Sequence, residues 1–152
     1  MITRDTEPDV FAHVEPIFHD AAFIRHLGIR LEAAGRGWCR TSIAVGPDHL
    51  QQHGFVHAGV ITTLADHTAG GSARAAVDPG TDVITIEFKI NFLKPAKADR
   101  LTATGQVLRA GKTIIASESE VYAMSAEGPV LVAKCMSTLA VIPQRERVRP
   151  QA

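Results

Sequence analysis

Three side chains between residues 50 and 66 have types and spacings that suit acid–base chemistry. They are Gln51, His57 and Asp66. A carboxylate can attack a carbonyl carbon or take a proton from water, while N–H donors stabilise the negative charge that develops on the carbonyl oxygen. The segment therefore predicts a site at which a negative charge forms during the reaction.

His57 lies at the predicted start of a helix that covers residues 57–77 and ends before the turn sequence Asp78-Pro79-Gly80. The first backbone N–H groups of a helix have no partner inside it, and the helix dipole favours negative charge there. Asp66 follows nine residues later, about 13 Å along the axis. A site that uses both residues would need a second copy of the chain with its helix antiparallel. The spacing therefore predicts a dimer, provided that both residues act together.

The elements that must position these residues suggest an α+β protein. The first segment reads as a helix over Val10–Leu27, interrupted by Pro16 and capped by Gly28, and residues 144–152 read as a polar tail. We expect residues 1–27 to form an N-terminal helical segment and residues 28–143 to form the main domain. Its predicted strands cover 29–45 with a break at 35–37, 83–93, 101–108, and 113–142 with a break at 127–129. A long helix embraced by an antiparallel sheet, in this order, is the hotdog fold.

Two apolar patterns indicate how these elements pack. Five apolar residues in the strand after the helix alternate with polar ones, so we expect them to face the core. On the helix, a stripe that includes Leu64 should pack on the sheet, with Asp66 roughly opposite. Its small residues over 70–76 suggest that a backbone or a ligand approaches closely. The alternating strand residues are Ile84, Ile86, Phe88, Ile90 and Phe92.

Composition excludes several classes of function. The 152 residues carry 16 basic and 16 acidic side chains, which disfavours nucleic-acid binding. No apolar run is long enough for a membrane span, and the first ten residues do not resemble a secretory signal. Cys39 and Cys135 are too few for a disulfide framework, and we expect them to be small core residues. A cytoplasmic location without a metal or cofactor fits best, and a metal site at His53, His57 and Asp66 is disfavoured because they do not share one helix face.

The spacing Gln51-(five residues)-His57-Ala58-Gly59-(six residues)-Asp66, followed by Thr85 and by Phe92-Leu93-Lys94-Pro95-Ala96, resembles the hotdog-fold acyl-CoA thioesterases. The nearest branch is the phenylacetate-degradation (PaaI-type) enzymes. The resemblance extends from about Phe23 to Ile142. Two positions differ from the usual pattern, because Ala58 replaces a glycine and Gln51 replaces an asparagine.

The resemblance implies that a small or medium acyl-CoA, aromatic ones included, is hydrolysed to the free acid and CoA. Asp66 would be the general base or nucleophile, and the Ala58 N–H would polarise the thioester carbonyl. Gln51 would hold the carbonyl or the water, His57 would order this corner, and Thr85 would position the water. The implied assembly is a homodimer with shared active sites, pairing into a tetramer. Substrate-binding residues would be Gly59, Lys94, Arg109 and Lys112.

Two other functions fit parts of the sequence. A hotdog module that binds acyl-CoA without hydrolysis is suggested by Ala58, although a pure binding protein has no need of the acid at Asp66. A hotdog dehydratase or hydratase usually pairs histidine and acid at other spacings. Arg109 and Lys112 could also be ordinary solvated turn charges.

Overall fold

The computed structural model describes residues 4–144, and the predicted polar tail therefore lies almost wholly outside the described residues. The secondary structure follows the predicted order. The elements are α1 (Pro8–His19), α2 (Ala22–Leu27), β1 (Arg30–Gly35), β2 (Trp38–Ala44), the 3-10 turn η1 (Pro47–His49), α3 (Ala58–Arg74), β3 (Thr81–Phe92), β4 (Arg100–Ala110), β5 (Ile114–Ser125) and β6 (Gly128–Pro143).

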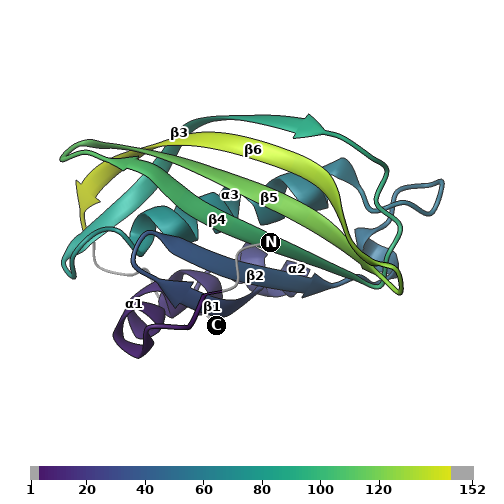
Figure 1. The fold of residues 1–152 in the computed structure, drawn as a ribbon, viewed down its shortest axis with the longest axis horizontal. Helices are drawn as coiled ribbons and strands as arrows, with labels where there is room; N and C mark the ends of the chain where they lie inside the picture. Colours follow the sequence, from purple (N-terminus) through teal and green to yellow (C-terminus); the bar gives the residue numbers. More distant parts are fainter. Residues whose placement is uncertain (1–3, 145–152) are drawn as a thin grey trace.

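Six strands form one antiparallel sheet in the order β1-β2-β4-β5-β6-β3, and α3 lies along its concave face (Figure 1). The predicted α+β hotdog architecture is thus confirmed. The predicted apolar stripe of α3 packs on the sheet, and Ile61, Leu64 and Ala65 are buried. β1 and β3 are the two edges of the sheet, and α1 packs beside β1. β3, the other edge, has no comparably extensive contact with the N-terminal helices.

The N-terminal helical segment differs from the prediction in one respect. Pro16 does not interrupt the helix, because α1 runs through it to His19 and the chain breaks at residues 20–21 instead. Val14 and Phe18 on either side of Pro16 are buried, so tertiary packing compensates for the backbone bond that proline cannot make. Gly28 ends α2 in the left-handed conformation, with φ of 71°, as predicted.

The prediction for β3 is wrong, since its five alternating apolar residues do not share a core-facing side. A β-bulge at Ile86 inserts an unpaired residue between Thr85 and Glu87. Before the bulge, Ile84 is opposite Ala140 of β6, on the outer face of the sheet. After the bulge, Phe88 is opposite the buried Ser137, on the face toward the helix. Four of the five are exposed, with Ile86 at 57%, because an edge strand lacks a neighbour on one side.

α3 approaches the sheet closely, as its small residues predict. A Cβ on Gly71 would lie 2.9 Å from the Cys39 sulfur, and one on Gly105 in β4 would lie 2.6 Å from the Thr68 carbonyl oxygen. Two serine hydroxyl groups of β5 bond to the helix across this short distance. Ser119 donates to the Ala65 carbonyl oxygen, and Ser117 shares its hydrogen between the carbonyl oxygens of Ala69 and Gln106. The sheet therefore holds α3 by hydrogen bonds as well as by apolar contact.

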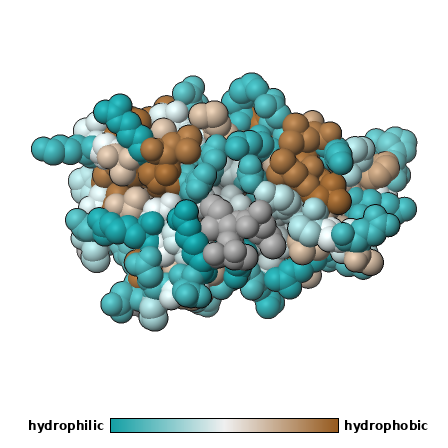
Figure 2. All heavy atoms as spheres, viewed as in Figure 1, coloured by the Kyte–Doolittle hydropathy of each residue, from teal (hydrophilic) through white to brown (hydrophobic). Residues whose placement is uncertain are grey.

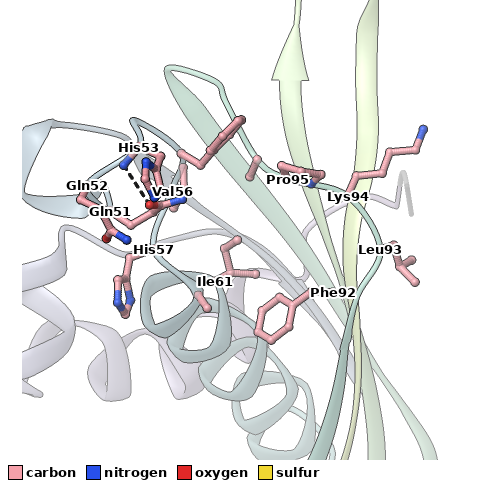
Figure 3. A pocket seen from close by; sticks show the side chains of 13 residues that line it. Gln51, Gln52, His53, Val56, His57, Ile61, Phe92, Leu93, Lys94 and Pro95 are labelled. Atoms are coloured by element: carbon pink, nitrogen blue, oxygen red, sulfur yellow. Dashed lines mark hydrogen bonds between the residues drawn. The ribbon is translucent and has the colours of Figure 1, made fainter.

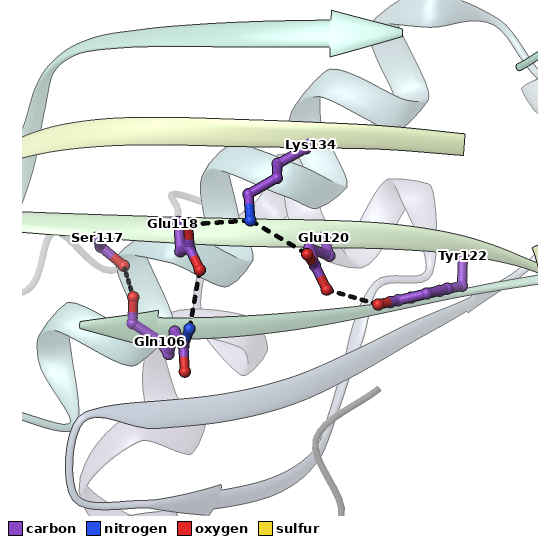
Figure 4. A network of polar contacts seen from close by, with 6 residues as sticks. All are labelled: Gln106, Ser117, Glu118, Glu120, Tyr122 and Lys134. Carbon is purple, nitrogen blue, oxygen red and sulfur yellow. Dashed lines mark hydrogen bonds and ion pairs between the residues drawn. The ribbon is translucent and has the colours of Figure 1, made fainter. Parts of the chain in front are cut away.

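The outer face of the sheet is polar at its centre. Figure 2 shows apolar surface toward both ends of this face with hydrophilic atoms between them. In Figure 4, Lys134 lies between Glu118 and Glu120 at 3.1 and 3.2 Å, and Tyr122 donates to Glu120. Burial and this bond raise the pKa of Tyr122 to about 12. Because these charges pair with one another, the network joins β5 to β6 and has the character of a structural contact.

No helix among residues 4–144 is long and apolar enough to cross a membrane. Cys39 and Cys135 are both buried and free, as predicted. The Cys39 thiol donates to the Thr68 carbonyl oxygen at 3.2 Å.

Candidate active site

A cavity of about 710 Å³ opens at the N-terminal end of α3 (Figure 3). Gln51, His53 and His57 lie along one side of it, on the loop that precedes the helix and at the helix start. Phe92 and Lys94 lie on the opposite side, where β3 ends. The cavity thus combines polar donors with an apolar wall, as small-molecule sites do.

His57 caps α3. Its Nδ1 accepts the Gly59 N–H at 2.9 Å, and its carbonyl oxygen accepts the Val60 N–H. With Nδ1 used as an acceptor, a neutral His57 carries its proton on Nε2. Ala58 begins the helix with an ordinary helical backbone, because no non-glycine residue of the described chain has a positive φ. The backbone conformation at this position therefore does not require a glycine, and the Ala58 N–H has no intrahelical partner.

The loop before α3 is organised by its polar side chains. Gln51 Oε1 accepts the backbone N–H of His53 at 2.9 Å, so the amide nitrogen of Gln51 keeps its two N–H donors. His49 accepts the Gly46 N–H through Nδ1, and its carbonyl oxygen accepts the His57 N–H. His49 thus has a structural role in this loop. The loop holds Gln51 beside the start of α3.

Asp66 is half-buried and faces β3. Thr85 Oγ1 donates to Asp66 Oδ1 at 3.0 Å. Burial raises the pKa of Asp66 above its ordinary value, and the Thr85 hydrogen bond opposes part of that shift. A carboxylate with a raised pKa is a stronger base and is more readily protonated, which is the character expected of a catalytic acid–base group.

One chain brings only some of the predicted residues together. Gln51, His57, Ala58 and Lys94 line the cavity, whereas Asp66 and Thr85 do not. Asp66 follows Ala58 by eight residues of continuous helix, about 12 Å along its axis. The distance expected from the sequence is thus present in the structure.

The predicted cations lie at two ends of the sheet. Lys94 follows the Phe92 end of β3, while Lys112 lies in the turn between β4 and β5, level with the Ile84 end. Arg109 is exposed near the same turn. Gly59 is exposed beside the cavity but does not line it.

Sequence reasoning gave no role to two groups near Asp66. The Cys135 thiol lies close enough that the Asp66 charge contributes to its raised pKa, after burial. His67 packs under α1, where it contacts the Ile17 carbonyl oxygen at 3.2 Å and the Phe18 ring edge-on, with a centroid distance of 4.6 Å. Burial lowers the pKa of His67 to about 4. The local sequence around His67 gives no sign of these contacts, because the contacting residues belong to α1, far away in the sequence.

Among residues 4–144, no group of three or more His, Cys, Asp or Glu side chains could hold a metal ion. The alternative grouping of His53, His57 and Asp66 is therefore not assembled within one described chain.

Known proteins similar to this chain point to one family. The family model described as "Thioesterase superfamily" matches residues 53–127. A protein of Saccharolobus solfataricus that carries an esterase assignment is 34% identical over 113 residues, which are 74% of this chain and 80% of that protein. The 1,4-dihydroxy-2-naphthoyl-CoA hydrolase of Listeria monocytogenes is 29% identical over 57% of this chain and 71% of its own length.

Solved structures agree with these relatives. A thioesterase family protein from Silicibacter pomeroyi superposes with a TM-score of 0.85 at 27% identity, over 89% of this chain and 99% of that one. The E. coli PaaI protein shares the fold with a TM-score of 0.78 at 23% identity, over 89% and 94%. The half-buried Asp66, the open start of α3 and these similarities lead to one conclusion: the chain belongs to the thioesterase superfamily and is a hotdog-fold thioester hydrolase.

Proposed function

We propose that this protein hydrolyses acyl-CoA thioesters in a homodimer, with each active site formed by Asp66 of one subunit and the start of α3 of the other. The observation that carries the proposal is the position of Asp66. It is half-buried, has a raised pKa and is held by Thr85 about 12 Å along the helix from the Ala58 N–H. Two such helices running antiparallel would place each carboxylate beside the other helix's N-terminus.

The exposed edge of β3 supports this dimer. An edge strand carries unpaired backbone groups, and here its side chains Ile86, Phe88 and Phe92 add exposed apolar surface. Two β3 strands pairing antiparallel about a two-fold axis would bring the Phe92 end of one against the Thr81 end of the other. The cavity of one subunit would then adjoin Asp66 of the partner.

The same pairing suits a CoA substrate. In one chain, Lys94 lies at one end of the sheet, and Arg109 and Lys112 lie at the other end. In the dimer, Lys94 of one subunit would lie at the same end as Arg109 and Lys112 of the other. Their charges suit the phosphates of CoA. The relatives' names support this substrate class, since one of them hydrolyses an aromatic acyl-CoA. Small and medium acyl groups, aromatic ones included, are the proposed range.

The chemistry follows from the donors and the carboxylate. The Ala58 N–H and the Gln51 amide polarise the thioester carbonyl, where one such donor contributes about 3–4 kcal/mol to the transition state. Thr85 engages Asp66 Oδ1, and Oδ2 then attacks the carbonyl carbon or removes a proton from the attacking water. The C–S bond breaks and the sulfur leaves as a thiolate, which a thiol pKa of about 8.5 permits without a strong general acid. Water supplies the oxygen of the product acid.

The decisive experiment is thiol release from a panel of acyl-CoA esters by wild type and by Asp66→Asn. The variant should keep its fold and oligomeric state and lose at least a thousandfold in kcat. Asp78→Asn is the matched control, because Asp78 is an exposed turn residue whose side chain is 82% exposed and should not affect turnover. Undiminished turnover by Asp66→Asn would exclude the proposed role. Tight acyl-CoA binding by wild type without thiol release would instead support the non-catalytic binding module.

A further inference from the structure

A second cavity, of about 460 Å³, lies between α1, α3 and the first half of β3. Ile17 and Ala21 line it from the N-terminal segment, His67 and Arg74 from α3, and Val83 from β3. The proposed chemistry does not use this cavity. Its walls are mainly apolar, and His67 is neutral at physiological pH because its pKa is lowered to about 4.

The cavity lies near the reacting carboxylate, although Asp66 itself does not line it. His67 directly follows Asp66 in α3, and Val83 stands two residues before Thr85 in β3, so the Asp66–Thr85 hydrogen bond closes the same helix–strand gap that the cavity occupies. From there the cavity continues to Arg74, eight residues beyond Asp66. The helix rise makes that distance about 12 Å.

The far end of the cavity is polar. Arg74 is buried, with 2% of its surface exposed, and it pairs with Asp82 at 3.0 Å and with the Thr81 carbonyl oxygen. Its Nε is a buried donor with no hydrogen-bond partner among the described residues. Asp82 lines the cavity beside Arg74, so this end offers a carboxylate and a guanidinium to a polar group of a ligand.

We propose that this cavity receives the acyl group of the thioester, and that the preferred acyl group is a medium-length chain of about eight carbons with an oxygen atom at its far end. This inference rests on the proposed function, because it needs the thioester carbonyl beside Asp66. An extended chain advances about 1.25 Å per bond, given a bond length near 1.5 Å and tetrahedral angles. The eight bonds from the carbonyl carbon to a terminal oxygen therefore advance about 10 Å, and a hydrogen bond covers the remaining distance to the Arg74 end. The oxygen meets the Arg74 and Asp82 side chains that line this end of the cavity.

Filling the cavity tests this assignment. Ala21 is half-buried in the cavity wall, and its neighbour Ala22 is exposed and does not line it, so Ala21→Phe and Ala22→Phe form a matched pair. Ala21→Phe should lower kcat/KM for octanoyl-CoA at least tenfold and leave acetyl-CoA within twofold of wild type. Ala22→Phe should change neither value. An unaltered chain-length profile in Ala21→Phe would overturn the assignment of the cavity.

The polar end has a separate readout. Wild type should hydrolyse 8-hydroxyoctanoyl-CoA with a kcat/KM at least tenfold above that of octanoyl-CoA, since hydrogen bonds to charged groups give discrimination of that size. Ala21→Phe should abolish the preference. Equal kcat/KM values for the two substrates in wild type would overturn the role of Arg74. If wild type hydrolyses no acyl-CoA at all, the proposed function fails, whereas hydrolysis with an unchanged profile refutes only this inference.

Discussion

Thr85 Oγ1 donates a hydrogen bond to Asp66 Oδ1 at 3.0 Å, and this bond joins the exposed side of α3 to the edge strand β3. It fixes the carboxylate at the boundary where we expect a second subunit. It also stabilises the charged form of Asp66 against the effect of burial. A strand hydroxyl therefore influences both the direction and the basicity of the proposed catalytic group.

Replacing Thr85 should affect the chemical step. Thr85→Val should lower kcat about tenfold with little change in KM, because a hydrogen bond to a charged group is lost, a difference of roughly 1.4 kcal/mol. Loss of that bond also lets the pKa of Asp66 rise further, so the acidic limb of the kcat profile should move to higher pH. Thr85→Ser should restore both. A Thr85→Val enzyme with wild-type kcat and pH profile would mean that the hydroxyl has no part in catalysis.

Removing the Asp66 charge should stabilise the protein. The folded-state pKa of Asp66 is raised, so ionisation opposes folding and stability falls as pH rises through that value. Asp66→Asn should increase the free energy of unfolding at pH 7 by about 0.5–2 kcal/mol, the usual range for relieving such a functional cost. The gain should shrink toward pH 4. Urea unfolding at fixed protomer concentration measures both values, and a less stable variant at pH 7 would contradict the expectation.

The exposed β3 edge should be required for both assembly and turnover. Ile86→Asp should yield monomers by light scattering and lose activity, because a charge would enter the proposed interface and separate Asp66 from the partner's helix start. Ile114→Asp provides the control, since Ile114 is also an exposed apolar residue, at 43%, but lies in β5. Active Ile86→Asp monomers would refute the shared site.

His67 should make stability depend on pH. Its folded-state pKa of about 4 lies below the ordinary value of 6.5, so the unfolded chain binds more protons between these values. Stability should therefore be fully present above pH 6.5 and decrease as pH falls toward 4, with a slope of at most about 1.4 kcal/mol per pH unit. His67→Phe should flatten this dependence in urea unfolding experiments. An equal slope in both proteins would assign the effect to other groups.

The contact between Gly105 and α3 should not tolerate a methyl group. Gly105→Ala would place a Cβ 2.6 Å from the Thr68 carbonyl oxygen, which cannot retreat without moving the helix. We expect a loss of about 1–3 kcal/mol in the free energy of unfolding. Gly46→Ala is the control, because a Cβ on Gly46 would have no neighbouring atom closer than 3.9 Å, and this substitution should cost less stability. Gly54→Ala is not a suitable control, because Gly54 has a positive φ of 78°. Equal losses at Gly105 and Gly46 would contradict this explanation.

The sequence predicted the order of elements because its turn residues and helix limits are local signals. Gly28, Gly37 and Gly54 all have the positive φ that such signals indicate. It also predicted that Asp66 and His57 would be too far apart in one chain, because helix rise is constant. The bulge at Ile86 could not be predicted from the alternation of apolar and polar residues. The inserted residue leaves that alternation in the sequence unchanged, but it moves the following apolar side chains to the other face of the strand.

The surroundings of the site were less predictable because they depend on elements distant in sequence. His67 is covered by Ile17 and Phe18, fifty residues earlier in the chain. The cavity around Arg74 likewise combines α1, α3 and β3. No pattern within a short stretch of sequence predicts contacts between such distant elements.

The serine hydroxyls of β5 give α3 a property that apolar packing alone would not. Ser119 and Ser117 bond the carbonyl oxygens of Ala65 and Ala69, one helical turn apart on the same face. The helix cannot roll about its axis without breaking both bonds, and Asp66 follows the first of these anchored residues directly. The carboxylate is thus presented at a fixed angle, and adaptation to differently shaped acyl groups falls to the surrounding walls, which can vary without disturbing the base.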